Sequence, residues 1–151
     1  MTSLDTHKLL AALELGIIDP DDAIAWADRR VVEADDVPYW IIELSTSARA
    51  SRFDLADILQ EQVSEPVPTD REFLGAMAVR LFDLNHSLYD ILPKMYERFC
   101  LTSRPVEKDV GGTIFIIDDV DWDRDRATAT ARDFLQPYLD DGRDLLEITK
   151  K

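Results

Sequence analysis

The longest regular pattern in this sequence is an apolar stripe between residues 74 and 99. Apolar side chains recur there every three or four residues: Leu74, Met77, Leu81, Leu84, Leu88, Leu92, Met95 and Phe99. Such spacing keeps one face of an α-helix apolar, here over about eight turns. We therefore predict a helical spine, either kinked at Pro93, which removes an internal hydrogen bond, or interrupted near Asn85 and His86.

Signals for the start of a helix precede the other apolar stripes. Asp19-Pro20-Asp21-Asp22 combines an N-cap carboxylate, a first-turn proline and further acids at the positive end of the helix dipole. Asp35-Asp36-Val37-Pro38 repeats this pattern. A chain of 151 residues has the size of one domain. The predicted fold is therefore mostly α, a single-domain bundle of six or seven helices over residues 1–151.

The pattern changes after residue 102. Residues 113–117 (TIFII) are rich in β-branched side chains, and they predict a short strand or an extended segment lying in a groove. A strand needs a partner strand, and the sequence offers no clear one. A helix is expected again from Arg124 to Asp140, bent or ended by Pro137, with Gly142 following it.

The charge of the chain constrains its partners. It carries 31 acidic and 17 basic residues, a formal net charge of -14. Binding to nucleic acid needs a basic face, so nucleic acid is disfavoured and a basic protein partner is favoured. The first residues lack the basic leader of a signal peptide, and no apolar run is long enough to span a membrane. With Cys100 as the single cysteine, a cytoplasmic protein with a buried packing thiol is predicted.

The densest acidic segment, residues 118–125, is the first candidate site. Its members are the acids Asp118, Asp119, Asp121, Asp123 and Asp125, with Trp122 among them. A calcium loop fails in both registers, because Arg124 or Arg126 takes the glycine position. Two interpretations stay open: a solvated loop leading into a helix, or a patch that faces a partner, with Trp122 as its anchor. The acids Asp19, Asp21, Asp22, Asp35 and Asp36 form the other candidate face.

A metal site is the alternative for the middle of the chain. If residues 83–90 were one helix, Asp83, His86 and Asp90 would lie on one face and could approach a metal ion. The paired Glu and Glu-x-x-His pattern of di-iron bundles is absent, and so is a nucleophile elbow. An exposed or capping His86 is the competing interpretation, and no cofactor is predicted. Trp26 and Trp40 are expected to pack in the core.

A resemblance covers the first third of the chain. The segments Leu13-Glu14-Leu15-Gly16-Ile17-Ile18-Asp19-Pro20 and Ala23-Ile24-Ala25-Trp26-Ala27-Asp28, with Pro38-Tyr39 and Ile42-Glu43-Leu44-Ser45, carry it. They resemble the opening of small uncharacterised bacterial helical proteins, some of which are similar to immunity proteins of toxin systems. The resemblance implies an all-helical fold and a protein partner, and it transfers no catalytic residues.

These observations predict a noncatalytic acidic module that binds a basic protein, such as an immunity-type inhibitor of a basic toxin. Two other classes stay open at this level. One is a metal-binding bundle or enzyme that uses His86 with Asp83 and Asp90. The other is a structural or regulatory subunit whose acids only solvate its surface.

Overall fold

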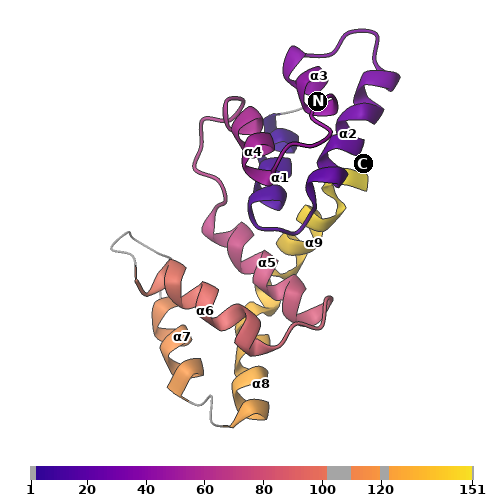
Figure 1. The fold of residues 1–151 in the computed structure, drawn as a ribbon. Helices are drawn as coiled ribbons and strands as arrows, with labels where there is room; N and C mark the ends of the chain where they lie inside the picture. The colour runs from indigo at the N-terminus through magenta and orange to yellow at the C-terminus, as the bar shows by residue number, and fades with distance from the viewer. Residues whose placement is uncertain (1–2, 102–109, 120–122, 151) are drawn as a thin grey trace. The chain divides into compact units, whose positions relative to one another are not determined.

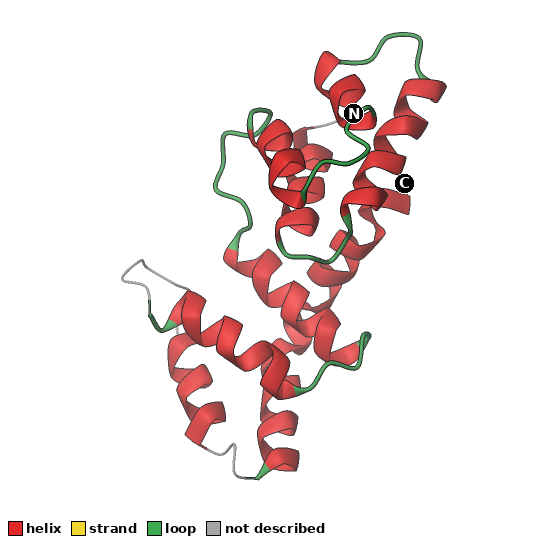
Figure 2. Cartoon of the chain, in the orientation of Figure 1, coloured by secondary structure: helices red, strands yellow, loops and turns green. Residues whose placement is uncertain are grey.

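The computed structural model describes residues 3–101, 110–119 and 123–150. These residues form helices and connecting loops, and no strand occurs among them (Figure 2). The α-helices are α1 (Ser3–Glu14), α2 (Pro20–Glu33), α3 (Tyr39–Ser45), α4 (Arg52–Gln60), α5 (Asp70–Phe82), α6 (Leu88–Phe99), α7 (Val110–Asp119), α8 (Arg124–Leu135) and α9 (Leu139–Glu147). Two short 3-10 helices, η1 (Gln136–Tyr138) and η2 (Ile148–Lys150), flank α9. The mostly α prediction is confirmed, with more helices than the six or seven expected.

The chain divides into two compact units. Unit 1 comprises residues 1–69 and 144–151, and unit 2 comprises residues 70–143, so the boundary falls inside α9 (Figure 1). That the whole chain acts as one domain stays a prediction.

Unit 1 is built around α1. This helix packs on α4, α2 packs on α3, and η2 contacts both α1 and α2. Fully buried leucines of α1, among them Leu9, Leu10 and Leu13, meet apolar side chains of the other helices in one core: Trp26, Ile41, Leu44, Leu55, Leu59, Leu145 and Ile148. Trp26 stacks on Trp40 with ring centroids 6.3 Å apart, so both tryptophans pack as predicted. Gly16 ends α1 with a φ of 68°, the left-handed conformation that favours glycine after a helix.

Unit 2 contains the predicted spine, which is interrupted and not merely kinked. α5 ends at Phe82, and Asn85 adopts the left-handed conformation with a φ of 56°. A new helix then begins after Ser87, whose backbone N–H donates to the Asp90 carboxylate at 2.8 Å. Pro93 lies inside α6 without dividing it. Of the two predicted positions for a break, the one near Asn85 and His86 is confirmed.

Both predictions for residues 113–117, a short strand or an extended segment in a groove, are wrong, because these residues belong to helix α7. Val110, Ile114 and Ile117 are buried at helical spacing, and α7 packs against α6 and α8. Burial of that face outweighs the modest preference of β-branched residues for strands. The predicted helix from Arg124 is α8, and its predicted bend or end at Pro137 is confirmed, since α8 ends at Leu135 and Pro137 lies in η1. A separate helix, α9, follows.

Candidate protein-binding surface

The excess of acids is greater in unit 1. That unit carries 16 acidic and 7 basic residues, a net charge of -9, whereas unit 2 carries 15 and 10, a net charge of -5. An acidic charge alone does not define a site, since solvated acids also keep a protein soluble. A binding surface needs apolar side chains that stay exposed beside those charges.

Unit 1 has such side chains on three successive helices. Val32 of α2, Tyr39 and Ile42 of α3, and Phe53 of α4 are 85%, 76%, 40% and 79% exposed. Tyr39 and Ile42 are one turn apart and share the outer side of α3, while Ile41 and Leu44 on its inner side are fully buried. Because α3 packs against both α2 and α4, the four exposed side chains come from neighbouring helices.

Carboxylates accompany these apolar side chains at helical spacing. Glu43 follows Tyr39 by four residues in α3, and Asp57 follows Phe53 by four residues in α4, so each aromatic ring has an exposed acid on its own face of the helix. More exposed acids follow along the chain: Glu33 is the last residue of α2, and Asp35 and Asp36 lie in the loop that leads to α3. We call this set the α3 surface: Val32, Tyr39, Ile42, Phe53, Glu33, Asp35, Asp36, Glu43 and Asp57.

A pocket of about 490 Å³ adjoins the loop between α2 and α3. Asp36 belongs both to the pocket lining and to the α3 surface. Trp26 lies in the wall, with the Arg30 guanidinium 5.0 Å from its ring centroid. Arg30 also lies 3.5 Å from a carboxylate oxygen of Glu33. The pocket therefore joins an indole, a cation and carboxylates, which suits a mixed polar and apolar contact with a protein side chain.

Two of the acids predicted at the start of α2, Asp19 and Asp22, make contacts that stabilise the end of this helix. The Asp22 carboxylate accepts a hydrogen bond from the Asp19 backbone N–H at 3.0 Å, and Asp19 lies 3.9 Å from Arg52. Asp21 is exposed in the first turn. Of the acids predicted for this face, Asp35 and Asp36 belong to the α3 surface.

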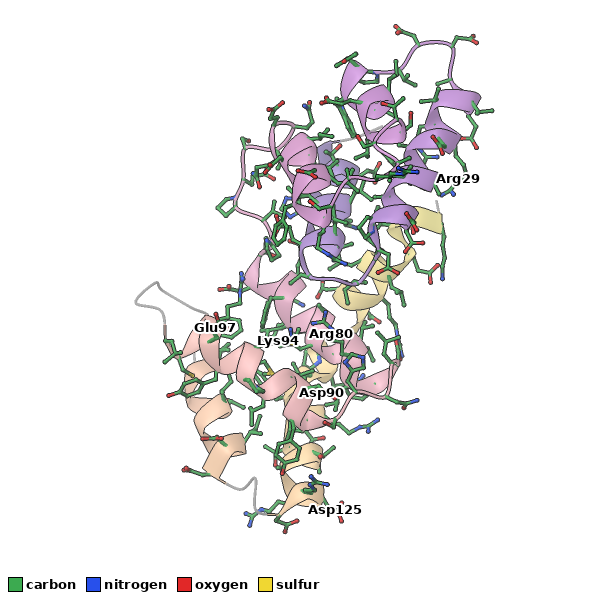
Figure 3. The ribbon with its side chains drawn as sticks, in the orientation of Figure 1. Arg29, Arg80, Asp90, Lys94, Glu97 and Asp125 are labelled. Atoms are coloured by element: carbon green, nitrogen blue, oxygen red, sulfur yellow. The ribbon has the colours of Figure 1, made fainter. Side chains whose placement is uncertain are left out.

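The predicted acidic segment 118–125 is only partly placed. Asp118 and Asp119 are exposed at the end of α7, where the helix dipole disfavours negative charge. Asp123 is the N-cap of α8, accepting from the Arg126 backbone N–H at 3.2 Å, and Asp125 is exposed in the first turn (Figure 3). Asp121 and Trp122 lie outside the described residues. That these acids act together on a partner stays a prediction.

The single helix face predicted for Asp83, His86 and Asp90 is wrong, because α5 ends at Phe82 and α6 begins at Leu88. Both carboxylate oxygens of Asp83 instead accept hydrogen bonds from Arg143 at 2.9 Å, and this contact lowers the pKa of Asp83. The pKa of Asp90 is lowered as well, by the hydrogen bonds from Ser87. Within the described part of the chain, no three His, Cys, Asp or Glu side chains converge as metal ligands.

Cys100 caps the C-terminus of α6 and is half-buried, in place of the full burial expected. Desolvation raises the pKa of its thiol, and the nearby Asp118 adds to the effect. A raised pKa keeps the sulfur protonated at neutral pH, so the structure gives Cys100 none of the features of an activated nucleophile.

Sequence reasoning missed the aromatic part of the α3 surface. Residues 39–44 (YWIIEL) are dense in apolar side chains, a composition typical of a buried helix. The available signal was the spacing, since Tyr39 and Ile42 fall on the side of the helix opposite Ile41 and Leu44.

None of the described helices is both long and apolar enough to cross a membrane. Comparison with known proteins found no matching family, no matching curated protein and no matching solved structure.

Proposed function

We propose that this protein is a noncatalytic interaction module that binds a basic protein through the α3 surface. The observation that carries the proposal is the pairing of two exposed aromatic side chains, Tyr39 and Phe53, with carboxylates one helical turn away. These pairs lie in a unit whose net charge is -9.

The two kinds of side chain have different roles in binding. Aromatic residues supply much of the affinity at protein interfaces, because each buries about 150–250 Å² and loses little conformational entropy. The surrounding carboxylates attract a basic partner from a distance and select against acidic proteins, which raises the association rate more than the affinity. Tyr39 and Phe53 are 76% and 79% exposed in the free protein, so most of their surface is available for burial.

An immunity-type inhibitor is the form of this function that we favour. A toxin that degrades nucleic acid needs a basic face to hold phosphates, and an acidic protein with aromatic anchors can cover that face. The resemblance of the first third of the chain to immunity-like proteins supports the same class. On this proposal the protein works by occlusion and performs no reaction of its own.

The test uses the protein encoded by the reading frame next to this one, purified as a probe. We expect it to be basic and to bind the full chain with an association rate that falls steeply as NaCl is raised. Tyr39→Ala or Phe53→Ala should weaken binding by about tenfold or more, as expected for an interface anchor. Tyr89→Ala is the matched aromatic control, because Tyr89 is 43% exposed in unit 2.

The acids are tested by a second matched pair of variants. Asp35→Asn with Asp36→Asn should slow association, whereas Asp118→Asn with Asp119→Asn removes the same charge from the end of α7 and should change it little. The opposite ranking would place the binding surface at the acidic segment 118–125. Absence of binding to the neighbouring gene product would count against an immunity function.

A further inference from the structure

Unit 2 holds a cluster of basic side chains around His86, although the whole chain is acidic. Two pockets, of about 510 and 450 Å³, adjoin there and share Asn85 and His86 in their linings. We call them the His86 pockets. The first is also lined by Arg80 and Lys94, and the second by Arg124 and Arg132. With His86 itself, five basic side chains therefore surround one short loop.

The break in the predicted spine creates this site. The His86 backbone N–H donates to the Arg80 carbonyl at 2.8 Å, which holds the loop against the end of α5. Asn85 can adopt its left-handed φ of 56° because asparagine tolerates that conformation better than most residues. Lys94 comes from α6, and Figure 3 shows it in the same region as Arg80 and Asp90.

Aromatic rings hold the two arginines of the second pocket. The Arg124 guanidinium lies 4.8 Å from the centroid of the Tyr89 ring, and that of Arg132 lies 4.6 Å from the centroid of Phe82. A guanidinium held on a ring keeps its charge and presents N–H groups at its edge, the arrangement by which arginine binds phosphate.

The balance of charge at the His86 pockets favours an anion over a metal ion. Among the described residues that line them, Asp90 is the one carboxylate, against four arginine and lysine side chains. Its carboxylate already accepts hydrogen bonds from the backbone N–H and hydroxyl of Ser87, at 2.8 and 3.1 Å. A cation would be repelled by the arginines and lysine, whereas phosphate oxygens could accept hydrogen bonds from several of them.

We propose that the His86 pockets bind a small molecule that carries a diphosphate group. Two adjoining basic pockets with a shared histidine fit two linked phosphates better than one. The second pocket adds the polar side chain of Thr128 and an apolar wall from Leu81 and Leu88, which could contact the organic part of such a ligand. This site lies within unit 2 and does not depend on the proposed function of the α3 surface.

The experiment titrates the full chain with inorganic pyrophosphate by isothermal calorimetry, with orthophosphate as a comparison. We expect pyrophosphate to bind more tightly than orthophosphate, and its affinity to fall as salt is raised. The double variant Lys94→Gln with Arg132→Gln removes one charge from each pocket and should weaken pyrophosphate binding by about tenfold or more.

Arg126→Gln with Arg71→Gln is the matched control, since it removes two charges from residues of unit 2 that are absent from both linings. This control should retain binding within about twofold of the original protein, and circular dichroism should show all variants folded. Equal weakening in the control and the pocket variant would mean nonspecific attraction and would overturn the proposal. So would orthophosphate binding as tightly as pyrophosphate, or the absence of pyrophosphate binding at low salt.

Discussion

Replacing Gly142 by alanine tests how closely α5 and α9 approach each other in unit 2. Gly142 is buried in α9, where a Cβ atom would lie 2.5 Å from the carbonyl carbon of Gly75 in α5 and 2.6 Å from Cγ2 of Val79. A Cβ on Gly75 would in turn lie 2.6 Å from the backbone nitrogen of Gly142. Each glycine therefore leaves room for the backbone of the other helix.

Two effects of opposite sign decide the stability of the Gly142→Ala variant. Alanine is favoured over glycine inside a helix by about 0.5–1 kcal/mol. Overpacking in a buried contact costs about 1–3 kcal/mol, and here the obstacle is mainly backbone, which cannot rotate away as a flexible side chain would. The two ranges leave a net loss of at most about 2.5 kcal/mol, and we expect about 2 kcal/mol because contacts with backbone atoms place the steric cost near the top of its range. The melting temperature should fall by about 4–8 °C in a chain of this size.

The assay is urea unfolding followed by far-UV circular dichroism, with thermal melting as a second measure. Asp140→Ala, at an exposed position of the same helix, is the control and should stay within about 0.5 kcal/mol of the original protein. Gly75→Ala should be destabilised like Gly142→Ala. If Gly142→Ala were as stable as the original protein or more stable, the close approach of α5 and α9 through these glycines would be refuted.

Three further predictions concern single contacts. The contact with Arg143 lowers the pKa of Asp83 in the folded state below its ordinary value of 3.8, so the contribution of Asp83 to stability should be complete above pH 3.8 and be lost as the pH falls through the lowered pKa. A carboxyl-detected NMR titration should show the lowered pKa, and the stability of Asp83→Asn should depend less on pH in the acid range than that of the original protein. Ser51→Ala removes the hydroxyl that accepts from the Asp54 backbone N–H at 3.2 Å and should destabilise the protein by about 1 kcal/mol in urea unfolding; an unchanged midpoint would show that the cap contributes nothing. Because burial and Asp118 raise the pKa of Cys100, its reaction with Ellman's reagent at pH 8 should be slower than that of free cysteine, and should approach the free rate only after unfolding.

Much of the fold could be predicted because its signals are local. The acid-proline pattern at residues 19–22 marks the start of α2, and Gly16 marks the end of α1, since cap chemistry depends only on a few neighbouring residues. The packing of Trp26 and Trp40 followed from their position beside apolar stripes. The site was predicted less well, because exposure of Tyr39 and Phe53 depends on which faces of α3 and α4 other helices cover.

The errors have a common origin in contacts between distant segments. Residues 113–117 have the composition of a strand, yet they form part of α7 because α6 and α8 cover the helical face of Ile114 and Ile117. The carboxylate of Asp83 was considered as a metal ligand, and it pairs with Arg143, sixty residues later in the chain. Neither partner could be identified from the local sequence.

The sequence by itself determined the helical class, the acidic charge and several helix ends, because periodicity, net charge and capping are properties of the chain or of short segments of it. Only the tertiary structure decided which apolar side chains stay exposed on α3, and that basic residues of α5, α6 and α8 meet at His86. It also gave Gly142 its role, as a contact point with Gly75 inside a helix. Each of these features depends on which helix faces lie against each other, and that is fixed by packing between residues far apart in the chain.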